Sequence, residues 1–199
     1  GPPTALAFLI DRGPVLEPLG INLGGYKPLL RSLKTLSIGL GGDSHVRVEE
    51  GRLKIGPERV GPAMAHGGPA PTPTDALIVL GLLKHGDPAK AAKGFEAIAG
   101  PLGLPVAAAA QHVFDETCRK ILDAVAEMLA QLNSQPVYTI HELYEGRAIV
   151  PEIMLVIGGP APVFAKRLET LSSYRVGVVP RWKVANAIGA ALARTTCEV

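Results

Sequence analysis

The first 60 residues carry the short apolar and alternating runs that are typical of β-strands. Ala5–Ile10 predicts one strand, and a second strand is expected from Val15, after a turn rich in glycine, proline and aspartate. Leu36–Ile55 predicts a β-meander: an apolar strand, a glycine-rich loop, and two alternating strands joined at Glu50-Gly51. We therefore expect residues 1–60 to form a β-rich segment.

Apolar positions take helical spacing further along the chain, and residues 74–132 predict a helical insertion. Helices are expected from Asp75, over residues 89–99 and over residues 106–132. Residues 150–199 then alternate as strand (153–157), helix (162–171), strand (176–179) and helix (184–194). This alternation predicts an α/β fold. Residues 56–73, rich in glycine and proline and without periodicity, predict an irregular functional loop.

Composition and charge favour a folded chain and argue against a nucleic-acid-binding or membrane-spanning protein. Hydrophobic residues make up 47% of the 199 residues, which favours a folded chain despite 23 glycines and 18 prolines. The 20 basic and 18 acidic residues leave a net charge of +2 with no basic run, so we expect no nucleic-acid partner. No apolar run predicts a membrane span or a secretory signal. The expected location is the cytoplasm, and the start without Met indicates a segment of a longer protein.

The glycine-rich loop is a candidate ligand-binding site. It consists of Gly39, Gly41 and Gly42, followed by Asp43 and Ser44. It matches neither a dinucleotide-binding fingerprint nor a P-loop, because a strand follows it and no Gly-Lys-Ser/Thr is present. Its bare backbone N–H groups are suited to an anionic oxygen, with a carboxylate and a hydroxyl beside them. The alternative is a glycine-rich hairpin loop without a ligand.

A second glycine pair, Gly158-Gly159, lies between an apolar strand and a helix. Open α/β sheets bind ligands at the carboxyl ends of their strands, and two glycines there admit a flat ring against the main chain. An ordinary tight turn is the alternative.

Two residues are candidates for acid–base chemistry. Asp75 is most simply a helix N-cap, and a second interpretation makes it a base or a magnesium ligand facing a cleft. His66, in the glycine- and proline-rich segment, is a candidate general acid or base because histidine titrates near neutral pH. A solvated loop histidine is the alternative.

Four motifs, in this order and spacing, resemble those of the hydantoinase/oxoprolinase A family. The resemblance runs over nearly the whole chain and is specific as a set. The motifs are TLSIGLGGDSHVRV (35–48), RLKIGPERVGP (52–62), PTPTDALIVLG (71–81) and VIGGPAP (156–162). The resemblance implies part of a hydantoinase A domain: an actin-like, ribonuclease-H-like lobe with a mixed sheet, a β-meander and flanking helices.

The resemblance also implies an activity. Members of this family are ATP-dependent hydrolases that open cyclic amides such as hydantoins or 5-oxoproline, with ATP and Mg²⁺ as cofactors. By the same resemblance, the loop from Gly39 to Ser44 lies near the active cleft, Gly158-Gly159 is the adenosine-side turn, and Thr74-Asp75 matches the family's Thr-Asp pair. The partners implied are a small cyclic amide and the remaining half of the enzyme or a partner subunit, with a homo-oligomer also open.

The start of the chain departs from the family pattern. Relatives have a phosphate-binding hairpin, Asp-Gly-Gly-Thr-Thr-Thr-Asp, where this chain has Pro2, Pro3 and Ala5. Proline has no N–H, so this hairpin is expected to bind phosphate poorly. A non-catalytic binding or scaffold domain of the same fold is therefore the alternative function. A sugar-kinase or acyl-phosphate-kinase lobe is a weaker third possibility.

Overall fold

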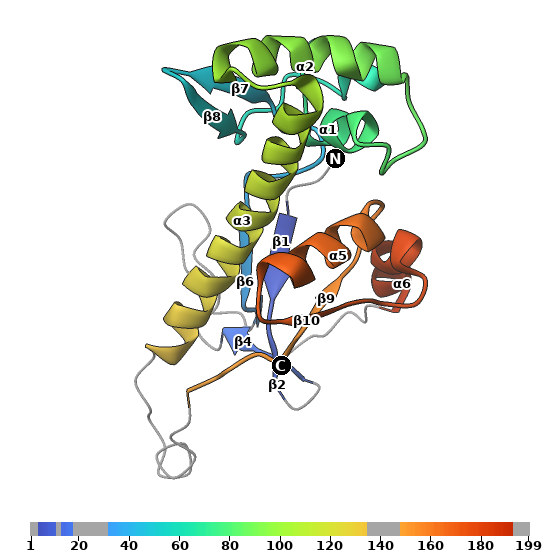
Figure 1. Cartoon of the computed structure of the whole chain (residues 1–199). Helices are drawn as coiled ribbons and strands as arrows, with labels where there is room; N and C mark the ends of the chain where they lie inside the picture. The colour runs from blue at the N-terminus through green and yellow to red at the C-terminus, as the bar shows by residue number, and fades with distance from the viewer. Residues whose placement is uncertain (1–3, 11–12, 18–31, 135–147, 193–199) are drawn as a thin grey trace, which may run out of the picture. The chain divides into compact units, whose positions relative to one another are not determined.

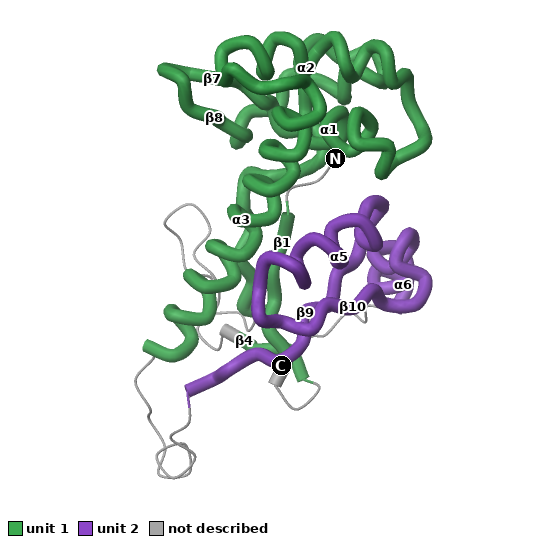
Figure 2. The backbone as a smooth tube through the Cα atoms, in the orientation of Figure 1, with its two compact units in different colours: residues 1–135 green, residues 136–199 purple. Residues whose placement is uncertain are grey.

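The computed structural model describes residues 4–10, 13–17, 32–134 and 148–192 (Figure 1). The chain divides into two units, Gly1–Gln135 and Pro136–Val199, each of which is described by itself (Figure 2). Unit 1 holds short strands and helices, and unit 2 holds two strands and their helices. The described residues therefore form a mixed α/β fold with small sheets.

The N-terminal part of unit 1 is a set of two-stranded antiparallel ladders. The pairs are β1 (Thr4–Ala7) with β6 (Thr35–Ile38), β2 (Leu9–Ile10) with β3 (Gly13–Pro14), and β4 (Leu16–Glu17) with β5 (Ser32–Leu33). Half-buried and exposed residues alternate along β1 and β6, as expected for strands with one covered face. The strands predicted near Ala5–Ile10 and Val15 are thus present as shorter pieces.

A separate hairpin joins β7 (Val46–Glu49) to β8 (Arg52–Ile55). Its turn is Glu50-Gly51, and both residues have positive φ, 51° and 72°. Two positive φ angles in a two-residue connection define the type I′ geometry that matches the twist of the flanking strands. The turn predicted from the sequence is therefore confirmed.

The predicted β-meander is wrong in the described residues. β6 pairs with β1, whereas β7 pairs with β8. The physical reason is the connection over residues 39–45, which is too long for a tight hairpin and packs against Pro57 and Thr74.

Three helices and a short 3₁₀ turn complete unit 1: η1 (Met64–His66), α1 (Pro73–Val79), α2 (Pro88–Leu102) and α3 (Val106–Asn133). α1 is shorter than the apolar run predicts, because Gly81 takes a φ of 69° two residues after its end. The helices pack on the β7–β8 hairpin around one apolar core. That core contains the buried residues Leu40, Val46, Ile55, Ala76, Phe95, Ile98, Ala99, Ala109, Ala110 and Val113.

Unit 2 confirms the predicted alternation of strands and helices. β9 (Ile153–Val156) pairs in parallel with β10 (Arg175–Val178), and α5 (Ala161–Leu171) connects them. α5 packs on both strands and buries Ala161, Ala165 and Leu168. The last predicted helix begins as a 3₁₀ turn, η2 (Trp182–Val184), and continues as α6 (Ala185–Leu192).

Among the described residues, no single helix is long and apolar enough to cross a membrane. The pair α2 and α3 passes the same length and composition criteria only when taken together, and the two helices meet at a bend of 87°.

Candidate functional site

The glycine-rich loop is closed by its own hydrogen bonds. The Gly41 N–H donates to Ser44 Oγ over 2.8 Å, and the Ser44 N–H donates to the Gly41 carbonyl over 3.1 Å. Ser44 is only 5% exposed. Its hydroxyl therefore has a structural partner inside the loop.

Two glycines of this loop are required by close packing. A Cβ at Gly39 would lie 2.6 Å from Pro57 Cβ, and a Cβ at Gly42 would lie 2.7 Å from Thr74 Oγ1. The Thr74 hydroxyl and N–H both donate to the Gly42 carbonyl, over 2.8 and 3.0 Å. The side of the loop that a Cβ would occupy is thus filled by the protein at both positions. This geometry favours the alternative in which these glycines serve packing.

Asp43 is the charged group of the loop. Arg59 Nη2 donates to Asp43 Oδ2 over 2.8 Å, and 20% of the Asp43 side chain is exposed. Partial burial acts to raise the pKa of Asp43, whereas the positive charge of Arg59 and its hydrogen bond act to lower it, and the resulting pKa lies below its ordinary value. Asp43 is therefore a carboxylate that stays ionised and keeps some contact with solvent.

Asp75 is fully buried and accepts four hydrogen bonds. The donors are Met64 N–H (3.0 Å), Ala65 N–H (2.8 Å), Thr72 N–H (2.9 Å) and Thr72 Oγ1 (2.9 Å). The N-cap of α1 is Thr72, and Asp75 is the third helical residue of a capping box, so the assignment of Asp75 as the N-cap is corrected. With both oxygens occupied, the carboxylate holds η1 against α1.

Of the segment 56–73 that was predicted to be irregular, residues 56–72 are irregular apart from η1, and Pro73 already begins α1. Asp75 anchors their middle, and the Gly68 N–H donates to the Ala63 carbonyl over 3.0 Å. A Cβ at Gly68 would clash with the Pro62 backbone. The segment is therefore tied to the core by buried hydrogen bonds, and its role in function stays a prediction.

His66 ends η1 with an exposed side chain. Its ring stacks on His85, with ring centroids 5.5 Å apart and planes inclined by 18°. Because Asp75 binds the N–H of the preceding residue, Ala65, the buried carboxylate fixes the backbone that presents His66. The acid–base role of His66 stays a prediction.

The glycine pair of unit 2 has the opposite character to Gly39 and Gly42. Gly158 takes a φ of 110°, and a Cβ on either Gly158 or Gly159 would meet no atom within 4 Å. The Gly158 N–H donates to the Trp182 carbonyl over 3.2 Å, which ties the turn to η2. The backbone at the carboxyl end of β9 is therefore open. Its assignment as the adenosine-side turn stays a prediction.

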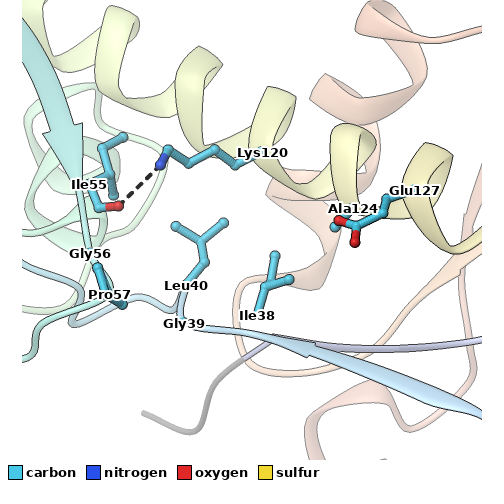
Figure 3. A pocket seen from close by; sticks show the side chains of 9 residues that line it. All are labelled: Ile38, Gly39, Leu40, Ile55, Gly56, Pro57, Lys120, Ala124 and Glu127. Carbon is cyan, nitrogen blue, oxygen red and sulfur yellow. Dashed lines mark hydrogen bonds between the residues drawn. The ribbon is translucent and has the colours of Figure 1, made fainter.

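A surface hollow in unit 1 was not predicted from the sequence. It has a volume of about 310 Å³ and lies between α3 and the ends of β6 and β8 (Figure 3). Its lining residues are Ile38, Gly39, Leu40, Ile55, Gly56, Pro57, Lys120, Ala124 and Glu127. The helix residues at 120, 124 and 127 follow the spacing of one helical face, but nothing in the sequence indicates which strands that face meets.

Within the described ranges, no three His, Cys, Asp or Glu side chains gather in a way that would hold a metal ion. Of the two predicted carboxylates, Asp75 does not fit a magnesium site because its oxygens are buried and occupied. Asp43 fits better, because Mg²⁺ bound to phosphates needs only one or two protein carboxylates.

The fold and the two glycine turns define an α/β protein with one open strand-to-helix turn. The family model described as Hydantoinase/oxoprolinase matches residues 3–199, and the chain belongs to this family. No protein with a curated description matches.

Two solved structures share the fold. A nucleotide-free acetone carboxylase, from work on ATP-dependent acetone carboxylation, is similar with a TM-score of 0.68 and 20% identity over 91% of this chain. The ATP-dependent caprolactamase from Pseudomonas jessenii has a TM-score of 0.63 and 21% identity over 82% of this chain. This chain spans only 26% and 24% of those two chains.

Proposed function

We propose that this chain is part of an ATP-dependent enzyme that opens a cyclic amide, such as a hydantoin or 5-oxoproline, by hydrolysis. Membership of the hydantoinase/oxoprolinase family supports this proposal. Both structural neighbours are described as ATP-dependent, and one of them is a caprolactamase, an enzyme named for a cyclic amide.

The observation that carries the proposal is the open backbone at Gly158-Gly159. It lies between β9 and α5, at the carboxyl end of a parallel strand, where α/β sheets bind ligands. We assign the adenosine of ATP to this turn and the surrounding fold to an actin-like lobe. The absence of any side chain over the two glycines is what a flat ring against the main chain requires.

The proposed reaction transfers the γ-phosphoryl group of ATP to the amide oxygen and releases ADP. Water then attacks the carbonyl carbon, the C–N bond breaks, phosphate leaves, and the nitrogen takes up a proton. Most of the rate enhancement in such a reaction comes from positioning and charge neutralisation. In this chain His66 is the candidate proton donor or acceptor, and Asp75 positions it through Ala65.

When bound, Mg²⁺ supplies charge neutralisation at the phosphates. Asp43 is the carboxylate of this chain that would hold the ion. Arg59 forms an ion pair with that carboxylate and helps to lower its pKa.

The proposed partners follow from the length of the match. Because the chain spans about a quarter of its structural neighbours, we assign the remaining parts of the catalytic unit to the rest of the enzyme, on the same polypeptide or on a partner subunit. The proposed location is the cytoplasm, where ATP is available.

Isothermal titration of ATP with Mg²⁺ into this chain joined to the rest of the enzyme tests the proposal. We expect binding that is weakened in a Gly159→Leu variant, whose side chain occupies the open turn. Gly100→Leu is the matched control, because a Cβ at Gly100 also meets no atom within 4 Å and lies on α2, outside the site. No binding at millimolar ATP would reject the proposed function.

A second candidate is a domain of the same fold that binds or scaffolds without catalysis. Ala5, where relatives are expected to have a carboxylate, lies exposed on β1; Pro2 and Pro3 lie outside the described residues. Combining Pro2→Thr, Pro3→Thr and Ala5→Asp is expected to create affinity for inorganic phosphate under this alternative. Unchanged phosphate binding would count against it.

A further inference from the structure

We propose that the hollow between α3 and the β6 and β8 strand ends binds a linear amino acid whose ammonium and carboxylate groups are separated by an apolar chain. This inference rests on the proposed function and narrows its substrate to a simple lactam, because hydrolysis of a ring with one amide and no other polar group yields a molecule of this class. The hollow has a volume of about 310 Å³, at the lower end of the range for small-molecule sites.

The floor of the hollow is apolar. Ile38 and Leu40 point from the β6 segment toward α3, and Ile55 and Pro57 close the end near β8 (Figure 3). Leu40 and Ile55 belong to the buried core, so this floor is held in place by packing. An apolar chain laid over it is removed from water, which favours its binding.

The side of the hollow that α3 forms carries opposite charges at its two ends. Lys120, Ala124 and Glu127 lie on one face of α3, and Figure 3 shows Lys120 reaching toward Ile55 while Glu127 lies beyond Ala124. Seven residues of helix separate the two charged positions by about 10 Å. The small side chain of Ala124 leaves the space between them open to a ligand.

The two charges are available to a ligand. Lys120 Nζ donates to the Ile55 carbonyl over 3.3 Å, a long hydrogen bond that uses one of its three donors. Within the described residues Lys120 has no carboxylate partner. Glu127 is exposed and accepts one hydrogen bond, from Gln131 Nε2 over 3.2 Å. A carboxylate at Lys120 and an ammonium at Glu127 would each gain a charge-assisted hydrogen bond.

The charge arrangement selects against other ligand classes. A dicarboxylate would place one negative group beside Glu127, and a diamine would place one positive group beside Lys120. A monovalent acid or amine satisfies one end only. The zwitterion with an apolar spacer is the class that matches both ends and the floor.

The test uses 6-aminohexanoate, the ring-opened form of caprolactam, titrated into the 199-residue chain without nucleotide. We expect saturable binding by calorimetry, and at least tenfold weaker binding of hexanoate and of hexylamine. Ala124→Leu fills the hollow and is expected to abolish binding, whereas Ala126→Leu, at an exposed position of the same helix, is expected to leave it unchanged. Thermal unfolding of both variants confirms that each is folded.

Lys120→Met and Glu127→Gln separate the two ends. Lys120→Met is expected to weaken the binding of 6-aminohexanoate at least tenfold and to change the binding of hexylamine little. Glu127→Gln is also expected to weaken the binding of 6-aminohexanoate at least tenfold, and to change the binding of hexanoate little. Absence of binding to the native chain, or binding that survives Ala124→Leu, would overturn the inference whatever the ATP titration gives. A failed ATP titration overturns the proposed function alone, and saturable binding with these variant effects still supports the hollow as an amino-acid site.

Discussion

Asp75 shows how one buried carboxylate organises a functional segment. It accepts two N–H groups from η1 as well as the N–H and hydroxyl of Thr72, the N-cap of α1. A buried carboxylate is stable only when its oxygens are hydrogen-bonded, and the four donors meet that condition. Asp75 thus joins the cap of a helix to the loop that carries His66.

Replacing Asp75 with Ala is expected to lower the free energy of unfolding by at least about 3 kcal/mol, because several buried donors lose a charged acceptor. Asp87→Ala is the matched control. Asp87 caps α2 through the Ala89 and Lys90 N–H groups near the surface, and its loss is expected to cost about 1 kcal/mol. Urea denaturation measures both. Equal effects of the two substitutions would contradict the anchoring role of Asp75.

Asp43 gives the fold a pH dependence whose sign follows from its lowered pKa. The folded-state pKa lies below the ordinary value of 3.8, so the carboxylate stabilises the folded chain above pH 3.8 and loses that contribution as the pH falls through the folded-state pKa. The urea midpoint measured above and below pH 3.8 is expected to fall less in Asp43→Asn than in the native chain. An identical pH dependence in the two proteins would argue against this electrostatic contribution.

The two glycine turns differ as structural elements. Gly39 has no room for a Cβ because Pro57 lies against it, whereas a Cβ at Gly159 would meet no atom within 4 Å. Glycine at the first position is therefore explained by packing. Glycine at the second has no packing reason, which is what a ligand-binding turn predicts.

Gly39→Ala is accordingly expected to destabilise the chain by about 1–3 kcal/mol through overpacking. Gly159→Ala is expected to change stability by less than about 0.5 kcal/mol and to weaken ATP binding. Thermal unfolding and calorimetric titration of the two variants give both readouts. A Gly159→Ala variant that binds ATP as the native chain does would leave the turn with a connecting role only.

At the scale of the whole molecule, each unit has its own packing. In unit 2, α5 covers one face of the parallel β9–β10 pair, while Ile153 and Leu155 on β9 and Ile157 just after it are 54%, 58% and 50% exposed. Parallel strands in α/β proteins usually have both faces covered. The stability of unit 2 in this chain therefore depends mainly on the α5 face.

A pair of substitutions tests this asymmetry. Leu168→Ala removes a side chain that is 1% exposed on α5 and is expected to cost about 2–5 kcal/mol. Leu155→Thr, on the exposed face of β9, keeps a residue suited to strands and is expected to cost less than about 0.5 kcal/mol. Hydrogen exchange of the β9 and β10 amides reports both effects. A large effect of Leu155→Thr would mean that this face is covered in solution.

Local sequence features predicted the elements whose formation depends on near neighbours. The long apolar stripe places α3 at Val106–Asn133, within one residue of the predicted 106–132, and Glu50-Gly51 predicts the hairpin turn. The strand, helix and strand of unit 2 follow the apolar runs that indicated them. Helical periodicity and turn geometry act over a few residues, so the sequence alone contains them.

Contacts between distant residues depend on tertiary packing. The pairing of β6 with β1, the burial of Asp75 under η1, and the meeting of Lys120 with the strand ends each join segments that are separated along the chain. No local pattern specifies such pairings, because the free energy that selects them comes from burying one segment against another. The order of the motifs was thus sufficient to place the chain in its family. Which glycines serve packing, and which leave the backbone open, followed only from the folded arrangement.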